Sequence, residues 1–343
     1  MNGLKASKAA EGYFFLSYAL QPSDLDFLNN TDAFSGYHDD QGSLPYGGYI
    51  KAVKDIESSY PILIDGMGLP TNVNAFQKET SVNGLSESDQ GNGLVRMLEA
   101  VKRENFLGAL ISDLDDQWCV SSQGPYNIPK GDKPLWQDAT DPLENRGILA
   151  LEPAPPEKIG LTLTDTGRMK ELQLSINDKY IYATIALNND INYDIEQLMV
   201  GLDTYLRNNG EYRYDPSYFA TSLSGMEYLI KFEGKNSAGL YCLPAYDKSK
   251  DSYASRESYK GNFNYIAPLK YGSFDSSDGE FYQTGSTIHI RIPWRLLNFT
   301  DPAKKIVLND GRTKPQILND PFGFKTIKTE GIIFSILIAN KQT

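Results

Sequence analysis

Hydrophobic positions in the first third of the chain form short continuous runs, separated by stretches with helical spacing. Residues 60–65 (YPILID) and 106–112 (FLGALIS) are apolar runs whose length suits strands buried on both faces of a parallel sheet. Apolar residues at helical spacing fill residues 49–56 and the segment after Ser86, which opens a capping box. Together with a strand expected at residues 33–37, this order predicts a parallel βαβαβ arrangement with right-handed crossovers.

The pattern changes after the proline-rich run EPAPPEK at residues 152–158, which indicates a stiff, extended linker. Apolar and polar residues then alternate through residues 161–187, and Asn177-Asp178 marks a turn, so this stretch predicts a β-hairpin. Five further strands are expected at residues 197–203, 226–233, 240–245, 287–293 and 332–339.

The expected fold class is therefore α/β plus all-β. An α/β segment is expected over residues 1–153, and an antiparallel β-sandwich is expected over residues 154–343.

Acidic residues follow the expected parallel strands, at the edge where α/β proteins bind their ligands. The residues at this edge are His38, Asp39, Asp40, Asp65, Asp113, Asp115 and Asp116. Carboxylates at three consecutive strand ends are a chemically meaningful group. Asp also favours loop starts and helix caps, so a structural role for these residues stays open.

The charge balance excludes several classes of partner. The formal net charge is -11, and a surface of this sign repels both phosphate backbones and anionic lipid. No apolar run approaches the roughly 20 residues needed to span a bilayer. The chain shows no export signal at its start, so an extracytoplasmic or cell-surface location is expected only if it belongs to a longer exported protein.

The two cysteines and two histidines give no zinc-binding spacing, and no cofactor is expected. A Cys119–Cys242 disulfide is one option that the sequence leaves open. Acidic loops could supply oxygen ligands to calcium, although no EF-hand spacing is present.

Several segments resemble a known family. They are DAFSGYHDDQGSLPYGGYIKAVKDIESSYPILIDGMGLPTN, GLSESDQGNGLVRMLEAV, FLGALISDLDDQW and PLWQDATDPLENRGILALEP, then VGLDTYLRNNGEYRYDP, GMEYLIKFEG and IHIRIPWRLLNFTDP. The first four look like the last third of a clan-A-type glycoside-hydrolase (β/α)₈ barrel from a little-characterised bacterial group. The last three are similar to strands of the sandwich that follows this barrel, a DOMON-like domain resembling family-nine carbohydrate-binding modules.

The chain departs from this family where the chemistry should lie. The resemblance implies a nucleophilic Glu at the end of the seventh barrel strand, but Gly66 stands there, with Asp65 just before it. The Trp-x-Asp-Glu-Trp pattern of the eighth strand is replaced by residues 113–117, and Trp118 lies one residue beyond. The strand with the acid/base Glu would lie upstream of residue 1. The resemblance therefore implies a degenerate barrel segment.

Three functions remain open. The first is a non-catalytic, carbohydrate-associated protein whose sandwich binds a glycan. The second is part of an active glycoside hydrolase that uses Asp65, Asp113, Asp115 or Asp116. The third is a structural or interaction module without a ligand. The α/β segment would pair with the missing part of the barrel, from a longer chain or another subunit.

For the first function, the densest polar-aromatic cluster of the sandwich is Asp203, Tyr205, Tyr212, Tyr214 and Asp215. If the segment is a strand, Tyr212 and Tyr214 lie on one face and form a sugar platform. Packing of the tyrosines across a hairpin is the alternative. In the α/β segment, His38, Asp39 and Trp118 are further candidates for ligand binding.

Overall fold

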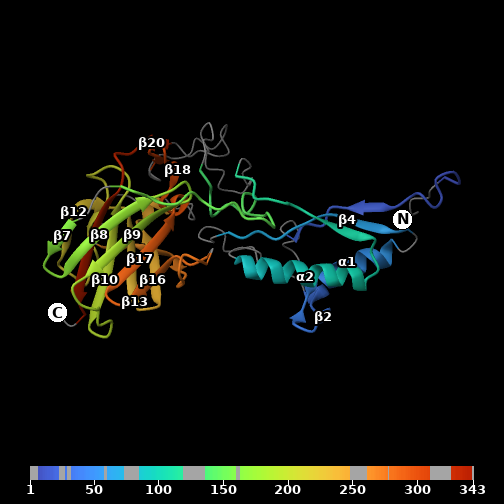
Figure 1. Ribbon diagram of the computed structural model, residues 1–343, viewed down its shortest axis with the longest axis horizontal. Coiled ribbons are helices and arrows are strands. Elements are labelled where there is room, and N and C mark those ends of the chain that lie inside the picture. Colours follow the sequence, from blue (N-terminus) through green and yellow to red (C-terminus); the bar gives the residue numbers. More distant parts are fainter. Residues whose placement is uncertain are drawn as a thin grey trace. The chain divides into compact units, whose positions relative to one another are not determined.

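The computed structural model describes residues 7–22, 28, 32–57, 60–72, 85–118, 136–159, 163–247, 261–276, 278–309 and 326–341. These residues form mostly β-strands, with two α-helices among them (Figure 1). They divide into two compact units. The N-terminal unit comprises the described residues up to Asn72 together with 85–118 and 142–151; the sandwich unit comprises residues 136–141 and the described residues from Glu152 onward.

The N-terminal unit is built on three parallel strands in the order β1-β4-β5. Their bounds are Leu16–Tyr18 for β1, Ile62–Met67 for β4 and Gly108–Ile111 for β5. Helix α1 (Pro45–Ile56) connects the first two, and helix α2 (Glu87–Arg103) connects the last two. Parallel pairing of the two apolar runs is therefore confirmed.

The strand expected at residues 33–37 is wrong. A short 3₁₀ helix, η3 (Asp32–Phe34), occupies this stretch, and a small hairpin follows it, formed by β2 (His38–Asp39) and β3 (Gly42–Ser43). The first parallel strand lies earlier, at β1. It is only three residues long, which explains why its periodicity is too weak to stand out in the sequence.

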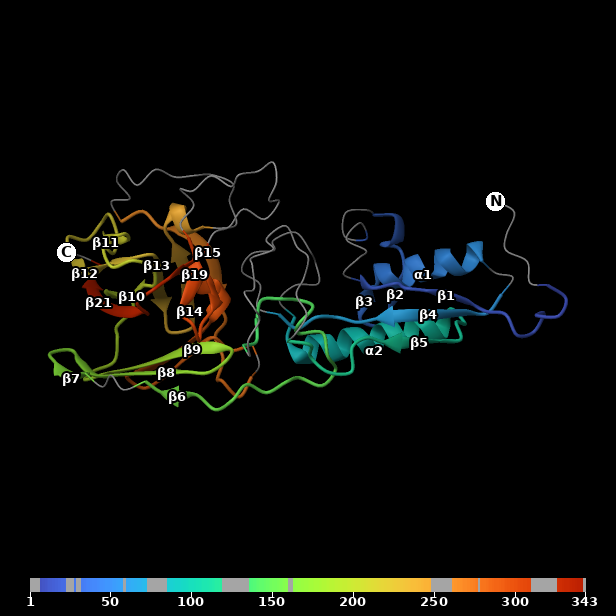
Figure 2. The same ribbon diagram turned by 90° about the horizontal axis from the view of Figure 1, so that it is seen from above.

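Both helices cover the same face of the parallel sheet (Figures 1 and 2). Ile62 and Ile64 of β4 are fully buried against them, together with Ile50 of α1 and Met97 of α2. The capping box predicted at Ser86 is present and starts α2.

The other face of this sheet is open within the described part of the chain. Phe15 and Leu110 expose 50% and 53% of their surface there, and Asp65 of β4 is also exposed. Strands β1 and β5 each pair along one edge only among the described residues. Three strands make an open sheet, so its closure into a barrel stays a proposal.

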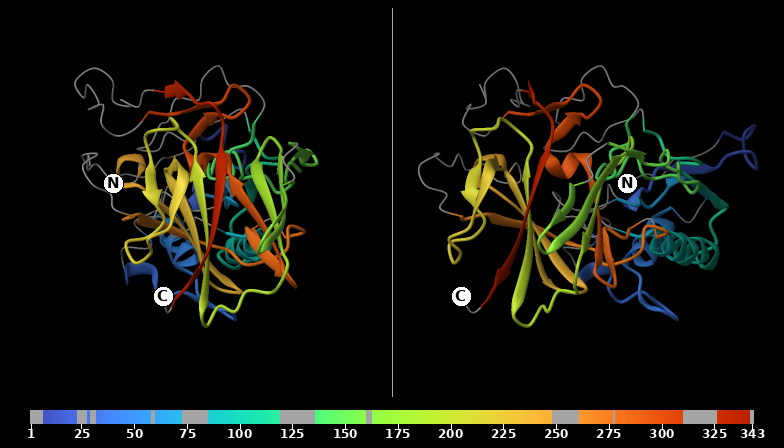
Figure 3. Two further views of the ribbon diagram at one scale, coloured as in Figure 1. Left: turned by 90° about the vertical axis from the view of Figure 1, so that its left-hand side faces the viewer. Right: turned by 60° about the vertical axis from the view of Figure 1, so that its left-hand side comes forward.

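The sandwich unit consists of two antiparallel sheets that face each other (Figure 3). One sheet has the order β15-β14-β13-β10-β21. Its strands are β10 (Glu196–Asp203), β13 (Tyr228–Gly234), β14 (Ser237–Cys242), β15 (Asn264–Leu269) and β21 (Ile333–Asn340). The other sheet has the order β16-β17-β9-β8-β6, and β7 also pairs with β8. Its strands are β6 (Glu157–Lys158), β7 (Leu163–Thr166), β8 (Met169–Ile176), β9 (Tyr180–Leu187), β16 (Phe281–Thr284) and β17 (Thr287–Pro293).

Shorter elements complete the sandwich unit. Two short strands, β11 (Glu211–Arg213) and β12 (Thr221–Met226), form a separate hairpin. The other short elements are η4 (Pro244–Tyr246), η5 (Trp294–Leu297), β18 (Phe299–Asp301), β19 (Ile306–Leu308) and β20 (Thr326–Lys328). The predicted hairpin at Asn177-Asp178 is confirmed, since β8 and β9 pair across that turn.

Apolar side chains from both sheets share one core. Val200 of β10 and Ile185 of β9 are fully buried in it, and the rings of Phe232 and Phe281 meet edge to face with centroids 5.5 Å apart. Inward-pointing and outward-pointing residues alternate along each strand. The inward apolar side chains therefore fill the space between the sheets, and the outward side chains lie on the outer faces of the two sheets. In the described ranges, no helix is long and apolar enough to cross a bilayer.

Candidate functional site

The acidic residues after β5 are engaged in contacts within the N-terminal unit. The guanidinium of Arg146 donates to Asp113 through both Nε and Nη2, at 3.1 and 2.8 Å. Asp116 is buried, and its two carboxylate oxygens accept hydrogen bonds from the amides of Gly147 and Leu151 at 3.0 and 3.1 Å. Both carboxylates therefore hold the segment of residues 146–151 against the end of β5.

The remaining carboxylates predicted for catalysis are exposed. Asp65 lies within β4, one residue before Gly66, whose φ of +91° is accessible to glycine at little cost. Asp115 is exposed, and its backbone forms an isolated β-bridge with Leu149. Trp118 is half-buried.

His38 and Asp39 lie on the β2–β3 hairpin and not at the end of a parallel strand, because the strand expected before them is absent. Arg96 of α2 forms a bidentate pair with Asp39, with N–O distances of 2.6 and 2.8 Å. This contact lowers the pKa of the Asp39 carboxyl to about 2. Asp39 thus fastens the hairpin to α2, while the side chain of His38 is exposed.

The tyrosine platform predicted in the sandwich unit does not form. Tyr214 is only 3% exposed and packs with Met199 and Met226, whereas Tyr212 is 38% exposed. The strand β11 ends at Arg213, so Tyr214 leaves the strand and turns inward. Asp215 lies nearby and pairs with Lys231 of β13.

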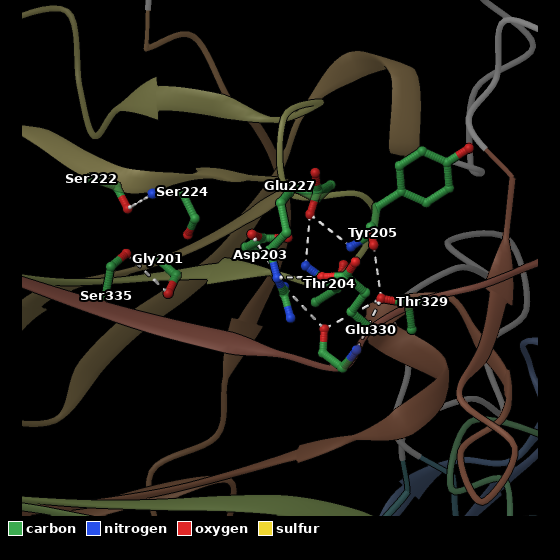
Figure 4. A network of polar contacts seen from close by, with 12 residues as sticks. Gly201, Asp203, Thr204, Tyr205, Ser222, Ser224, Glu227, Thr329, Glu330 and Ser335 are labelled. Carbon is green, nitrogen blue, oxygen red and sulfur yellow. Dashed lines mark hydrogen bonds and ion pairs between the residues drawn. The ribbon is translucent and has the colours of Figure 1, made fainter. Parts of the chain in front are cut away.

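Asp203 and Tyr205 belong to a buried polar network at the end of β10 (Figure 4). Glu227 accepts hydrogen bonds from the amides of Thr204 and Tyr205 at 2.7 and 3.1 Å. The carboxylate of Asp203 lies 3.3 Å from the guanidinium of Arg207.

Burial dominates the acid–base properties of this network. Burial raises the pKa of Glu227 to about 8. The hydrogen bond from the Thr204 amide lowers this pKa, whereas the negative charge of Asp203 raises it further. Burial also raises the pKa of Asp203, against the pull of Arg207. Neither carboxyl is exposed to solvent, so this network orders the chain around the end of β10 and offers no surface to a ligand.

A more accessible group of side chains lies on the outer face of the five-stranded sheet. The aromatic corner, as we name it, consists of Gly239, Tyr241, Tyr265, Lys231 and Glu233. Strand pairing places Lys231 opposite Gly239 and Tyr241 opposite Tyr265, so these side chains share one face. The two tyrosine rings meet edge to face, with centroids 5.3 Å apart and planes inclined at 71°. They therefore form two walls, and Tyr265 is 48% exposed.

Gly239 lets the two rings lean over the sheet. A Cβ atom at this position would lie 3.0 Å from the ring of Tyr265 and 3.1 Å from that of Tyr241. Such distances are closer than ordinary van der Waals contact, so a larger residue would push the rings away. Glycine is thus the residue that allows this ring arrangement.

Charged groups border the corner. The ammonium of Lys231 lies 5.2 Å from the centroid of the Tyr241 ring and also pairs with Asp215. Glu233 lies two residues further along β13, where the pairing with β14 is irregular, and is exposed. Burial raises the pKa of both the Tyr241 and Tyr265 hydroxyls, and the negative charge of Glu233 raises them further.

The sequence contains a signal for this corner that the predicted cluster passed over. Strands were expected at residues 226–233, which contain Lys231 and Glu233, and at residues 240–245, which contain Tyr241, whereas Gly239 lies one residue before the second range. Only the register of the sheet brings these residues and Tyr265 together.

Comparison with protein-family models, curated proteins and solved structures found no match. The likeness to a glycoside-hydrolase barrel and a carbohydrate-binding module therefore rests on the sequence segments alone.

The predicted metal and disulfide sites add little to the candidate site. Among the residues that the structure describes, no three His, Cys, Asp or Glu side chains gather as metal ligands. Cys242 is buried on β14, and Cys119, its partner in the disulfide that the sequence left open, lies outside the described residues.

Proposed function

We propose that this is a non-catalytic, carbohydrate-associated protein whose sandwich unit binds a glycan at the aromatic corner. The observation that carries the proposal is the pair of tyrosine rings over Gly239, inclined at 71° to each other, of which Tyr265 is 48% exposed and Tyr241 is half-buried. The apolar face of a sugar ring can stack on one wall while its hydroxyls reach the phenol groups, Lys231 and Glu233. Pockets and surfaces that bind small polar molecules commonly combine apolar contact with a few hydrogen-bonding groups in this way.

Such a surface binds weakly. Each aromatic contact contributes about 0.5–1.5 kcal/mol beyond area burial, whereas a millimolar dissociation constant already requires about 4 kcal/mol. We therefore expect dissociation constants in the micromolar-to-millimolar range.

The N-terminal unit supports a non-catalytic assignment. A retaining glycosidase needs two carboxyl groups about 5–5.5 Å apart at the reacting centre. Asp113 is paired with Arg146 and Asp116 with two backbone amides, while Gly66 has no side chain to act as a nucleophile. An active hydrolase that uses the exposed Asp65 or Asp115 is the alternative.

A second proposal concerns the open face of the parallel sheet. Parallel sheets are normally covered on both faces, and an unpaired strand edge invites pairing with further strands. The exposed Phe15 and Leu110, and the edges of β1 and β5 that are unpaired among the described residues, favour docking of further βα units, from a longer chain or another subunit. Sedimentation of the wild type and of Leu110→Glu tests this idea for self-association: faster sedimentation of the wild type alone would support it.

Titration of neutral oligosaccharides into the wild type and Tyr265→Ala tests the glycan proposal. We expect saturable binding by the wild type and a loss of about fivefold or more in the variant, because one ring wall is gone. Tyr212→Ala is the matched control, since Tyr212 is a partly exposed tyrosine of the same unit outside the corner. Equal binding by wild type and Tyr265→Ala would contradict the proposal, and no binding by the wild type would favour a structural or interaction module.

A further inference from the structure

We infer that the aromatic corner prefers glycans that carry a free amino group, and that Glu233 is the residue that determines this preference. The inference rests on the proposed function and names the class of sugar that this site would take.

Glu233 is placed to meet a ligand that stacks on the tyrosine rings. It lies two residues beyond Lys231 on β13, where the pairing with β14 is irregular. Its side chain is exposed. A side-chain hydrogen bond links it to the hydroxyl of Tyr241, and its negative charge raises the pKa of the hydroxyls of both Tyr241 and Tyr265.

The cation of the corner is already neutralised. Lys231 pairs with Asp215 and also lies over the ring of Tyr241, so its positive charge has two partners within the protein. The Asp215 carboxylate is held further by the amide of Ser217 at 2.9 Å. Lys235 lies in the turn between β13 and β14 and not on the outer face of a strand. Within the described part of the chain, the side chains that border the rings are Lys231, Asp215 and Glu233, and together they carry one negative charge in excess.

This charge distinguishes between classes of sugar. A protonated amine would donate a charge-assisted hydrogen bond to Glu233, which is stronger than the neutral bond formed by a hydroxyl or an acetamide. The same ammonium would be attracted to the face of a tyrosine ring. A sugar carboxylate in that place would face Glu233 and the net charge of -11, and would be repelled.

Three β-1,4-linked tetramers of equal length test the inference, one each of glucosamine, N-acetylglucosamine and glucose. At low ionic strength and a pH that protonates the amine, we expect the glucosamine tetramer to bind about tenfold more tightly than the other two. Added salt should weaken that preference, because it screens an exposed ion pair. Glu233→Gln should bring the glucosamine affinity within about twofold of the glucose affinity measured on the same variant, because the ion pair with the amine is lost.

Glu157→Gln is the control for overall charge. Glu157 is exposed on β6 of the other sheet, so this variant removes the same charge away from the corner. It should keep the preference for glucosamine. Equal loss in both variants would show that only the net charge of the protein attracts the amine, and would overturn the inference.

The outcomes separate the inference from the function on which it rests. Equal binding of all three tetramers, lost in Tyr265→Ala, would contradict the amine preference and leave the glycan site standing. A preference for glucosamine that survives in Glu233→Gln would contradict the role of Glu233. Binding that is unchanged in Tyr265→Ala, or no binding of any tetramer by the wild type, would contradict both.

Discussion

At the scale of single residues, Gly239 is the position on which the candidate site depends. The tyrosine rings lean over it because it has no side chain. We predict that Gly239→Ala displaces one ring and lowers glycan affinity about fivefold, the equivalent of roughly one lost aromatic contact. The free energy of unfolding should change by less than about 1 kcal/mol, since the displaced rings are the ends of side chains on an outer face.

Gly234→Ala provides the matched control for this prediction. Gly234 ends the neighbouring strand β13, and a Cβ there would lie 3.9 Å from Ser237, which is ordinary contact. Calorimetric titration and thermal unfolding of both variants give the comparison. Unchanged glycan affinity in Gly239→Ala would show that the ring arrangement is irrelevant to binding.

Glu227 gives a prediction on pH dependence. Burial raises its pKa from the ordinary value of 4.5 to about 8. Between these two pH values the folded state keeps a proton that the unfolded state has released, so the free energy of unfolding falls as the pH rises from 4.5 to 8. Glu227→Gln removes this titration, and its amide oxygen can still accept from the Thr204 and Tyr205 amides.

Urea unfolding of wild type and Glu227→Gln at pH 5 and pH 8 checks this sign. The variant should gain stability relative to the wild type on going from pH 5 to pH 8. Burial raises the pKa of Glu280 to about 7. Because Glu280 titrates in both proteins, its contribution to the pH dependence of stability cancels in the comparison. If the difference in the free energy of unfolding between the variant and the wild type were the same at both pH values, Glu227 would not titrate in this range.

The candidate residues could be predicted from the sequence only in part. Alternation shows which residues of a strand share a face, but not which face is buried. Tyr212 and Tyr214 have the spacing of a strand pair, yet Tyr214 lies beyond the end of β11 and is buried. Conversely, Tyr265 lies beside Tyr241 because of the register between β14 and β15. That register includes an irregularity, which the local sequence pattern does not predict.

At the scale of elements, a buried ion pair joins two separate segments of the sandwich unit. The Nε atom of Arg295 in η5 lies 3.1 Å from the Oδ2 atom of Asp138, and both side chains are almost completely buried. Breaking a buried pair leaves an uncompensated charge, which costs about 3–5 kcal/mol. We predict a loss of this size in Asp138→Ala, measured by denaturant unfolding.

The pair Lys51–Asp55 on α1 is the control, because both of its side chains are exposed. Asp55→Ala should cost no more than about 1 kcal/mol. If Asp138→Ala cost no more than Asp55→Ala, the buried pair would not stabilise the sandwich unit.

Several elements follow from local sequence. The capping box at Ser86 and the apolar runs at β4 and β5 predict their positions, as does the turn between β8 and β9. The strand β1 has three residues and little periodicity, so its place depends on pairing with β4. Elements with strong local signals are thus predictable, whereas short strands need their tertiary partners.

At the scale of the whole molecule, we predict that the chain does not hydrolyse glycosides. Asp113 and Asp116 are bound within the protein, and Gly66 stands at the expected position of the nucleophile. Incubation with aryl glycosides should release no more product than buffer alone. Turnover that Asp65→Asn or Asp115→Asn abolishes would contradict this, and would support the exposed carboxylates as catalytic groups.

The division into an α/β part and an all-β part was visible in the change of periodicity at the proline-rich run of residues 152–158. The structure shows a mostly β molecule with a three-stranded parallel sheet in its N-terminal unit. Sequence pattern could not show that residues 136–141 belong to the sandwich unit, where Trp136 joins the core. That assignment depends on contacts between segments far apart in the chain.

The most direct test of the central claim is to observe the tyrosine rings while a glycan is added. In protein carrying ¹³C-labelled tyrosine, single Tyr→Phe variants assign the ring signals in NMR spectra. Titration with the oligosaccharide should shift the signals of Tyr241 and Tyr265 in a saturable way and leave Tyr46 unchanged, because Tyr46 is buried in the core of the N-terminal unit. Shifts confined to other tyrosines, or no shift at millimolar glycan, would contradict the claim that the aromatic corner binds carbohydrate.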